Sequence, residues 1–114
     1  MTGKYIKLCK ISELEELKGN RYHLDDEYEV AVFMIRGKVY VVDNVCPHNH
    51  TPKIADGYIK GNYVVCPVHL YQFDFKTGKP KNNVGGKLRI FETMIKDEYL
   101  YVKKPASKLF DFNF

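Results

Sequence analysis

Short runs of alternating hydrophobic and polar residues dominate the chain, and this is the pattern of half-buried β-strands. Residues 28–44, YEVAVFMIRGKVYVVDN, contain two such runs on either side of Arg36-Gly37-Lys38, which predicts a β-hairpin. Residues 58–66, YIKGNYVVC, repeat this form around Gly61-Asn62. These two segments are therefore expected to form pairs of antiparallel strands.

Two further segments continue the pattern. Residues 88–104, LRIFETMIKDEYLYVKK, predict a third hairpin with its turn near Lys96-Asp97-Glu98, and residues 71–75, YQFDF, alternate aromatic and polar side chains. Tyr, Phe, Val and Ile are concentrated in all these runs, as a pleated surface favours. The sum predicts an all-β domain of roughly eight to ten short strands.

One short helix is expected near the N-terminus. Ser12 and Glu15 have the spacing of a capping box, and Leu14 and Leu17 give the segment one apolar side. At the other end, residues 105–114, PASKLFDFNF, start at a proline, and we expect this tail to fold back on the domain. The chain of 114 residues is thus interpreted as one domain, residues 1–104, with a C-terminal tail.

Composition excludes several classes of protein. Hydrophobic residues make up 45% and charged residues 28% of the chain, which is typical of a soluble globular protein. No apolar run approaches the roughly 18–20 residues that span a bilayer, and the first ten residues contain no apolar signal core. We therefore expect a cytoplasmic protein without a membrane segment.

The net charge of +4 comes from lysines scattered along the chain. A solvated surface explains such lysines most simply, and a docking face for an acidic protein partner is the next interpretation. The combination of basic and stacking residues that marks nucleic-acid-binding modules is absent, so no nucleic-acid partner is expected.

Candidate chemistry is concentrated in two short loops, Cys46-Pro47-His48 and Cys66-Pro67-Val68-His69. The chain has three cysteines, an odd number that cannot be fully paired, and reduced thiols near histidines indicate a metal site. Each loop follows a β run, and each cysteine is followed by a proline that fixes φ. Rigid loops of this kind suit ligands to a metal.

Two thiolates and two imidazoles fit two kinds of centre. A tetrahedral zinc ion needs all four ligands within about 2.3 Å of one atom, and its usual spacing leaves about two to four residues within a ligand pair. Cys46-x-His48 leaves only one residue. In a [2Fe–2S] cluster the ligands are shared between two irons, so each loop can give its cysteine to one iron and its histidine to the other.

These residues resemble the Rieske iron–sulfur proteins, whose pattern is C-x-H, then a linker, then C-x-x-H. In this chain the linker between His48 and Cys66 has seventeen residues, which is similar to the length in that family. The resemblance covers about residues 4–104. Further matching features are DNVCPH (43–48), Pro52, Gly57, Gly61, CPVH (66–69) and FDFKTGKP (73–80).

The resemblance implies a fold, a cofactor and four ligands. The fold is of small antiparallel sheets with a cluster-binding part at about residues 44–80, and the cofactor is one [2Fe–2S] cluster. Cys46 and Cys66 would bind the inner iron, whereas His48 and His69 would bind the outer iron near the surface. Electrons would leave through the two imidazole rings.

Departures from the family pattern narrow the choice. High-potential members join their two loops by a disulfide, but the matching positions are Thr51 and Val68. Those members also place hydroxyl donors where this chain has Tyr71 and Phe73. These differences point to a soluble, low-potential Rieske ferredoxin. Leu70 stands where the family usually has glycine, which would permit a positive φ, so the geometry of the second loop is an open question.

Three other residues attract attention and receive simpler interpretations. His50 and His23 are expected to be surface histidines rather than ligands. Cys9 lies in the first predicted strand and is expected to be a small buried side chain.

The sequence is therefore interpreted as a one-electron carrier rather than an enzyme, because it shows no substrate-site signature and no nucleophile–base pair. Its expected partners are redox proteins. The first setting is a reductase and an oxygenase; the alternative is the large subunit of an NAD(P)H-dependent nitrite reductase, with this chain as the small subunit. An alternative of another class is a structural zinc module that binds a protein partner.

Overall fold

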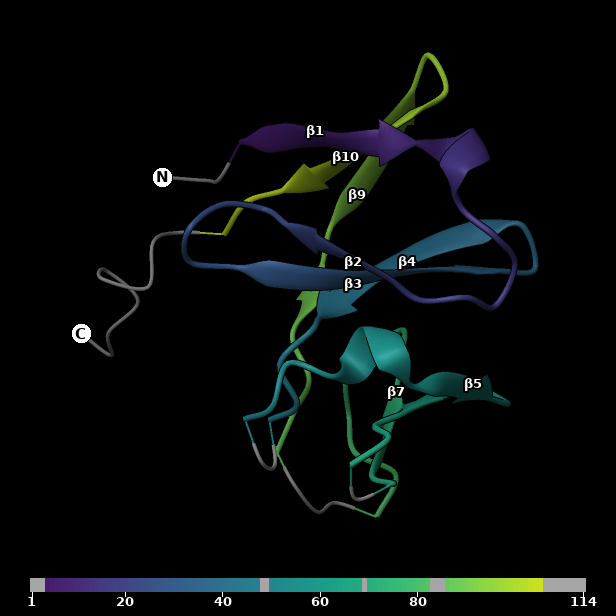
Figure 1. Cartoon of the computed structure of the whole chain (residues 1–114), viewed down its shortest axis with the longest axis vertical. Helices are drawn as coiled ribbons and strands as arrows, with labels where there is room; N and C mark the ends of the chain where they lie inside the picture. The colour runs from purple at the N-terminus through teal and green to yellow at the C-terminus, as the bar shows by residue number, and fades with distance from the viewer. Residues whose placement is uncertain (1–3, 48–49, 69, 83–85, 106–114) are drawn as a thin grey trace.

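The structure is a computed structural model that describes residues 4–47, 50–68, 70–82 and 86–105. Ten β-strands and two single 3₁₀ turns are found in this part of the chain, and the strands form three small antiparallel sheets (Figure 1). The all-β prediction is confirmed. Among the described residues, no helix is long and apolar enough to cross a membrane.

The central sheet has four strands. In spatial order they are β2 (Asn20–His23), β3 (Glu29–Ile35), β4 (Lys38–Asp43) and β8 (Ile90–Phe91). The predicted turn between β3 and β4 is present at Arg36 and Gly37, whose φ angles are both positive, 53° and 79°. A two-residue turn with both residues left-handed matches the twist of the strands it joins.

The second sheet packs above the central one in Figure 1 and consists of β1 (Tyr5–Lys10), β10 (Tyr99–Lys103) and β9 (Thr93–Lys96). The predicted turn is present at Asp97 and Glu98, again with both φ angles positive. The predicted run of residues 88–104 is divided, however. Its first part, β8, pairs with β4, and only β9 and β10 form the hairpin.

The third sheet lies below the central one, and the second cysteine loop joins two of its strands, whereas the first cysteine loop follows β4. Its strands are β5 (Tyr58–Lys60), β6 (Tyr63–Val65) and β7 (Gln72–Asp74). The turn between β5 and β6 falls at Gly61-Asn62, as the sequence predicts, and Gly61 has a φ of 60°. A 3₁₀ turn that the sequence did not predict, η2 (Ile54–Asp56), precedes β5.

The helix near the N-terminus is a single 3₁₀ turn, η1 (Ile11–Glu13), and the predicted capping box is wrong. Ser12 lies inside the turn, and no side chain caps it. The backbone returns to an extended conformation at Leu14, whose side chain enters the core. The carboxylate of Glu16 then accepts hydrogen bonds from the backbone N–H groups of Arg36 and Gly37. This segment therefore binds to the turn of the β3–β4 hairpin and does not continue as a helix.

The central strand β3 is buried on both faces and separates two cores. Ala31, Phe33 and Ile35 belong to a core shared with the third sheet, whereas Val30 and Val32 belong to a core shared with the second sheet. Side chains of a strand point alternately to opposite faces, so a nearly continuous apolar run supplies both cores. The third sheet is thus held on one face of a strand whose residues are mostly buried.

The C-terminal tail is described only as far as Pro105. The expectation that residues 106–114 fold back on the domain concerns residues outside the described part. The backbone before the tail is anchored, because the N–H of Lys104 donates to the carbonyl of Lys4 and its ammonium group lies 2.5 Å from the carboxylate of Asp25.

Gly57 and Gly61 allow a matched test of the third sheet. A Cβ atom on Gly57 would lie 1.9 Å from the carbonyl oxygen of Val65, whereas a Cβ on Gly61 would meet no atom within 4 Å. We expect Gly57→Ala to lower the free energy of unfolding by about 3 kcal/mol, because the backbone must move to relieve the overlap. Gly61→Ala should cost only about 1 kcal/mol, which reflects its left-handed φ.

Urea denaturation of both variants checks this prediction. Equal losses of stability would show that β5 and β6 are not packed as closely as described.

Candidate metal centre

The two cysteine loops have the same backbone architecture. In the first loop the N–H of Cys46 donates to the carbonyl of Thr51 at 2.9 Å, and the N–H of His50 donates to the carbonyl of Cys46 at 2.7 Å. In the second loop the N–H of Cys66 donates to the carbonyl of Tyr71, and that of Leu70 donates to the carbonyl of Cys66, both at 2.9 Å. Each cysteine is therefore held from both sides by the backbone of its own loop.

The equivalence extends to backbone conformation. The fourth residue after each cysteine, His50 in the first loop and Leu70 in the second, has a left-handed conformation with φ of 59° and 61°. The open question about Leu70 is thereby answered. The loop keeps the conformation that glycine would adopt most easily, and Leu70 adopts it at a cost in strain.

Regular elements place the loops at one end of the molecule. The first loop follows β4 and the second joins β6 to β7, and both lie at the lower end of the view in Figure 1. Cys46 and Cys66 are completely buried in the same core, which also contains Phe73 and Val64. All cysteines of the chain are thiols. The two loops therefore bring both thiols into the same part of the interior.

Asn44 fixes the start of the first loop, a role that sequence reasoning missed. It is the one polar side chain among the described residues that is fully buried. Its Nδ2 donates to Glu29 Oε2 at 2.9 Å and to the carbonyl of Pro52 at 3.1 Å, and its Oδ1 accepts from the N–H of Ala55 at 2.7 Å. The amide thus joins β3, the first loop and η2. The available signal was an asparagine at the end of an apolar run, two residues before Cys46.

The predicted ligands His48 and His69 lie outside the described residues, so their ligation stays a prediction. In the described part of the chain, no three His, Cys, Asp or Glu side chains gather in a way that would hold a metal ion. The side chains around the predicted histidines face outward: Val68 is 42% exposed and Leu70 is 59% exposed. The second loop therefore runs from a buried cysteine to an exposed surface within four residues.

The residues at the donor positions fit the expectation of few hydroxyl groups. Phe73 is completely buried and offers no donor. Tyr71 is half-buried and packs against the core that contains the cysteines. Thr51 supplies its backbone carbonyl to Cys46, and Val68 cannot form a disulfide.

Cys9 is separate from the centre. It lies in β1, in the core on the other face of the central sheet, and is 7% exposed. Burial raises the pKa of its thiol, and the hydrogen bond with the Tyr22 hydroxyl works in the opposite direction. The predictions of a buried Cys9 and of exposed His23 and His50 are confirmed.

Comparison with known proteins decides the identity of this arrangement. Residues 4–92 match the sequence profile of the Rieske [2Fe-2S] domain. The chain belongs to the Rieske [2Fe–2S] domain family.

Individual relatives agree with this assignment. The ferredoxin component of the naphthalene 1,2-dioxygenase system of Pseudomonas putida is 35% identical over 80 residues, which are 69% of this chain and 74% of the relative. The solved ferredoxin of Sphingomonas yanoikuyae B1 has a TM-score of 0.80 and 25% identity, with 90% of this chain and all of that chain covered.

A third comparison concerns the fold alone. A structure described as the small subunit of an NADH-dependent nitrite reductase from Mycobacterium tuberculosis has a TM-score of 0.84 and 20% identity, with 92% of this chain and 98% of that chain covered.

This Rieske protein binds a [2Fe–2S] cluster and transfers electrons, and the cluster supplies the one-electron chemistry. The described residues fit the group, because two buried thiols on rigid loops offer the soft ligands that an iron–sulfur cluster requires. The interpretation as an electron carrier rather than an enzyme is confirmed by its ferredoxin relatives.

The strain at Leu70 gives a first prediction. We expect Leu70→Gly to raise the free energy of unfolding by up to about 1 kcal/mol, because glycine adopts the left-handed conformation without a Cβ clash and the exposed leucine side chain loses little packing. Leu70→Ala, which keeps the clash, is the control and should change stability little. Thermal unfolding of the cluster-loaded protein measures both, and an alanine variant more stable than the glycine variant would contradict the strain.

The buried amide gives a second prediction. We expect Asn44→Asp to lower the free energy of unfolding by about 3 kcal/mol or more, because the new carboxylate is buried beside Glu29 and the carbonyl of Pro52. Asn62→Asp makes the same chemical change at an exposed turn and should be nearly neutral. Urea denaturation and the iron content of both variants check this, and an Asn44 variant of normal stability would exclude the role given to the amide.

Proposed function

We propose that Cys46, His48, Cys66 and His69 hold the cluster, with the cysteines on the inner iron and the histidines on the outer one. The equivalence of the two loops carries this proposal. Both cysteines are buried under the same pair of backbone hydrogen bonds, and the histidines follow two and three residues later along loops that run toward the surface. The single domain is taken as residues 1–104, with its cluster-binding part at about residues 44–80.

The proposed ligand set explains why two of the ligands are neutral. Replacing two thiolates by two imidazoles removes two negative charges, so the reduced cluster is less costly and its potential rises above that of an all-cysteine cluster. Hydrogen bonds to the sulfur atoms raise the potential further. Because Phe73 has no hydroxyl group and Thr51 and Val68 form no disulfide, we place this protein at the low end of the Rieske range, which runs from roughly −150 to +300 mV.

We propose that the protein is a cytoplasmic ferredoxin that passes one electron at a time from a reductase to an oxygenase. Support comes from the dioxygenase ferredoxin component, which is the relative with 35% identity. The second candidate is the small subunit of an NAD(P)H-dependent nitrite reductase, because the chain shares the fold of such a subunit with a TM-score of 0.84. Since 20% identity supports the fold alone, we place the oxygenase system first.

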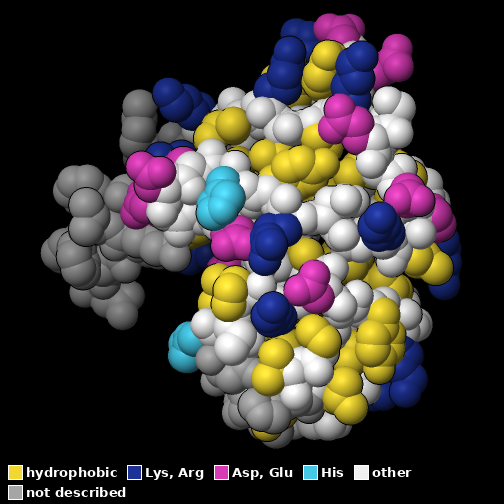
Figure 2. Space-filling model, viewed as in Figure 1, with side chains coloured by type: hydrophobic (Ala, Val, Ile, Leu, Met, Phe, Trp, Pro, Cys, Tyr) yellow, Lys and Arg dark blue, Asp and Glu magenta, His cyan; other side chains and the backbone are white. Residues whose placement is uncertain are grey.

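The cluster end of the molecule has an apolar surface that suits contact with such a partner. Val68 and Leu70 are exposed hydrophobic residues of the second loop, and Pro52, after the first loop, is also exposed. Tyr58 in β5 is 50% exposed. Figure 2 shows hydrophobic side chains gathered over the lower right of this face, where β5 and η2 lie. An apolar end of this kind would bring the outward side of the cluster close to the partner.

A change of ligand tests the proposed centre. We expect His48→Cys and His69→Cys each to lower the reduction potential by roughly 100 mV where the cluster assembles, because a charged ligand replaces a neutral one. His23→Cys, at an exposed position in β2, is the matched control and should leave the potential unchanged. Redox titration followed by EPR measures all three, and an unchanged or higher potential in the ligand variants would contradict the proposed ligation.

Metal analysis separates the cluster from the zinc module. Anaerobically purified protein should contain two irons and two acid-labile sulfides per chain and should show the visible and EPR spectra of a histidine-ligated cluster. One zinc per chain without sulfide would support the zinc alternative. A stable complex with a sirohaem reductase subunit would favour the nitrite reductase setting over the free carrier.

A further inference from the structure

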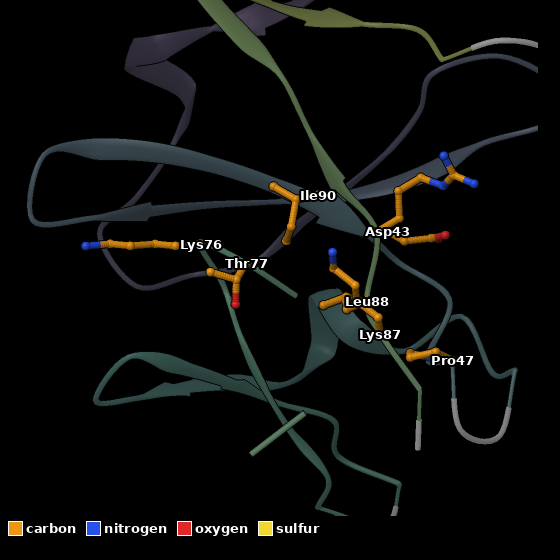
Figure 3. Close-up of a pocket in the computed structure, with 8 residues that line it drawn as sticks. Asp43, Pro47, Lys76, Thr77, Lys87, Leu88 and Ile90 are labelled. Carbon is orange, nitrogen blue, oxygen red and sulfur yellow. The ribbon is translucent and has the colours of Figure 1, made fainter. Parts of the chain in front are cut away.

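A hollow of about 500 Å³ lies beside the first cysteine loop, between the cluster-binding sheet and the central sheet (Figure 3). Pro47 of the loop forms its lower edge in this view. The turn after β7 contributes Lys76 and Thr77, the segment before β8 contributes residues 87–89, and β8 itself contributes Ile90. The hollow therefore adjoins the cluster loops and is formed by segments far apart in the sequence.

The charge of this hollow is predominantly positive. Lys76, Lys87 and Arg89 line it and are exposed, and Asp43 is its one acidic residue. Lys87 points into the space between Thr77 and Asp43 in Figure 3. Neither Lys76 nor Lys87 forms an ion pair with the described acidic residues of this chain. The two ammonium groups are thus available to an anionic group from outside the chain.

Two neighbouring hollows extend this surface. One, of about 380 Å³, shares Ile90 with the first and continues past Tyr40 toward Tyr5. The other, of about 120 Å³, shares Tyr40 with the second and Lys76 with the first, and adds Arg36 and Lys38. We call the three together the basic strip.

The basic strip carries most of the charge of the chain. It contains five basic side chains and two acidic ones, a net charge of +3, and the whole chain has a net charge of +4. One of the acidic residues, Glu92, is already paired with Lys103 at 3.0 Å. A surface of one charge sign beside a low-dielectric wall attracts ligands of the opposite sign.

The shape and composition of the strip favour a protein segment over a small anion. Three neighbouring hollows that share lining residues offer more room than a single phosphate or carboxylate requires, and the strip includes the half-buried Tyr40 and the exposed Tyr5. Protein interfaces combine such aromatic contacts with a charged rim. The strip also begins at Pro47, so an occupant would lie against the loop of a cluster ligand.

We propose that the basic strip docks an acidic segment of the protein that exchanges electrons with this one. Carboxylates of the segment pair with Lys87, between Thr77 and Asp43, and with Lys76, which points away from Pro47 on the other side of Thr77 (Figure 3), and its chain continues along Tyr40. The nature of the occupant as a redox partner rests on the proposed carrier function, whereas binding of an acidic segment does not. Charge complementarity of this kind speeds encounter and fixes orientation.

A binding measurement on the cluster-loaded protein tests the basic strip without any electron transfer. The probe is a fluorescein-labelled peptide of eight glutamates, followed by fluorescence anisotropy at an ionic strength of about 0.1 M, where charges more than about 10 Å apart are largely screened. The test variant is Lys76→Glu with Lys87→Glu. The control variant is Lys10→Glu with Lys96→Glu, which makes the same change in net charge in the second sheet, at the ends of β1 and β9.

We expect the test variant to weaken peptide binding at least about tenfold and the control variant to weaken it less than about threefold, because the control changes only distant, screened charges. The visible spectrum of the cluster should be the same in all three proteins. Equal weakening by both variants would overturn the proposal in favour of net charge alone. Absence of binding by the unmodified protein would also overturn it, and so would displacement of the peptide by tripolyphosphate at lower concentrations than by unlabelled peptide.

Discussion

The structure depends on how the backbone of each short loop closes around its buried cysteine. Each cysteine donates its N–H to the carbonyl five residues ahead and accepts from the N–H four residues ahead, so the loop closes on itself around the ligand. Closing the loop requires a left-handed residue at the fourth position, which the chain fills with His50 and Leu70 instead of glycine. The backbone strain at these two residues thus accompanies the closed loops that hold the two buried thiols rigidly.

That pair of loops needs a rigid support, and β3 provides it. The strand is buried on both faces and joins two cores, so the cluster-binding sheet cannot shift without disturbing the second core. Asn44 connects this support to the first loop through hydrogen bonds to Glu29, Pro52 and Ala55. The buried amide therefore links the central sheet to the first cysteine loop. Both its Nδ2 and its Oδ1 atoms form hydrogen bonds.

The surface complements the interior. The interior fixes the sulfur ligands, while the exposed residues of the second loop give an apolar end and the basic strip gives a charged flank beside the first loop. An electron carrier must recognise partners and release them, and contacts of both kinds near the cluster favour oriented but reversible association. Basic residues that are scattered along the sequence thus lie together on one surface only when the chain is folded.

The sequence by itself determined most of the strands and turns and the chemical identity of the centre, but it did not predict β2. Alternation and paired turn residues such as Arg36-Gly37 are local signals, and a pattern of two cysteines and two histidines is specific enough to identify the family. Only the tertiary structure decided the division of residues 88–104 between two sheets, the replacement of the predicted capped helix by a 3₁₀ turn, and the role of Asn44. These features depend on contacts between residues distant in the chain, and local propensity carries no information about such contacts.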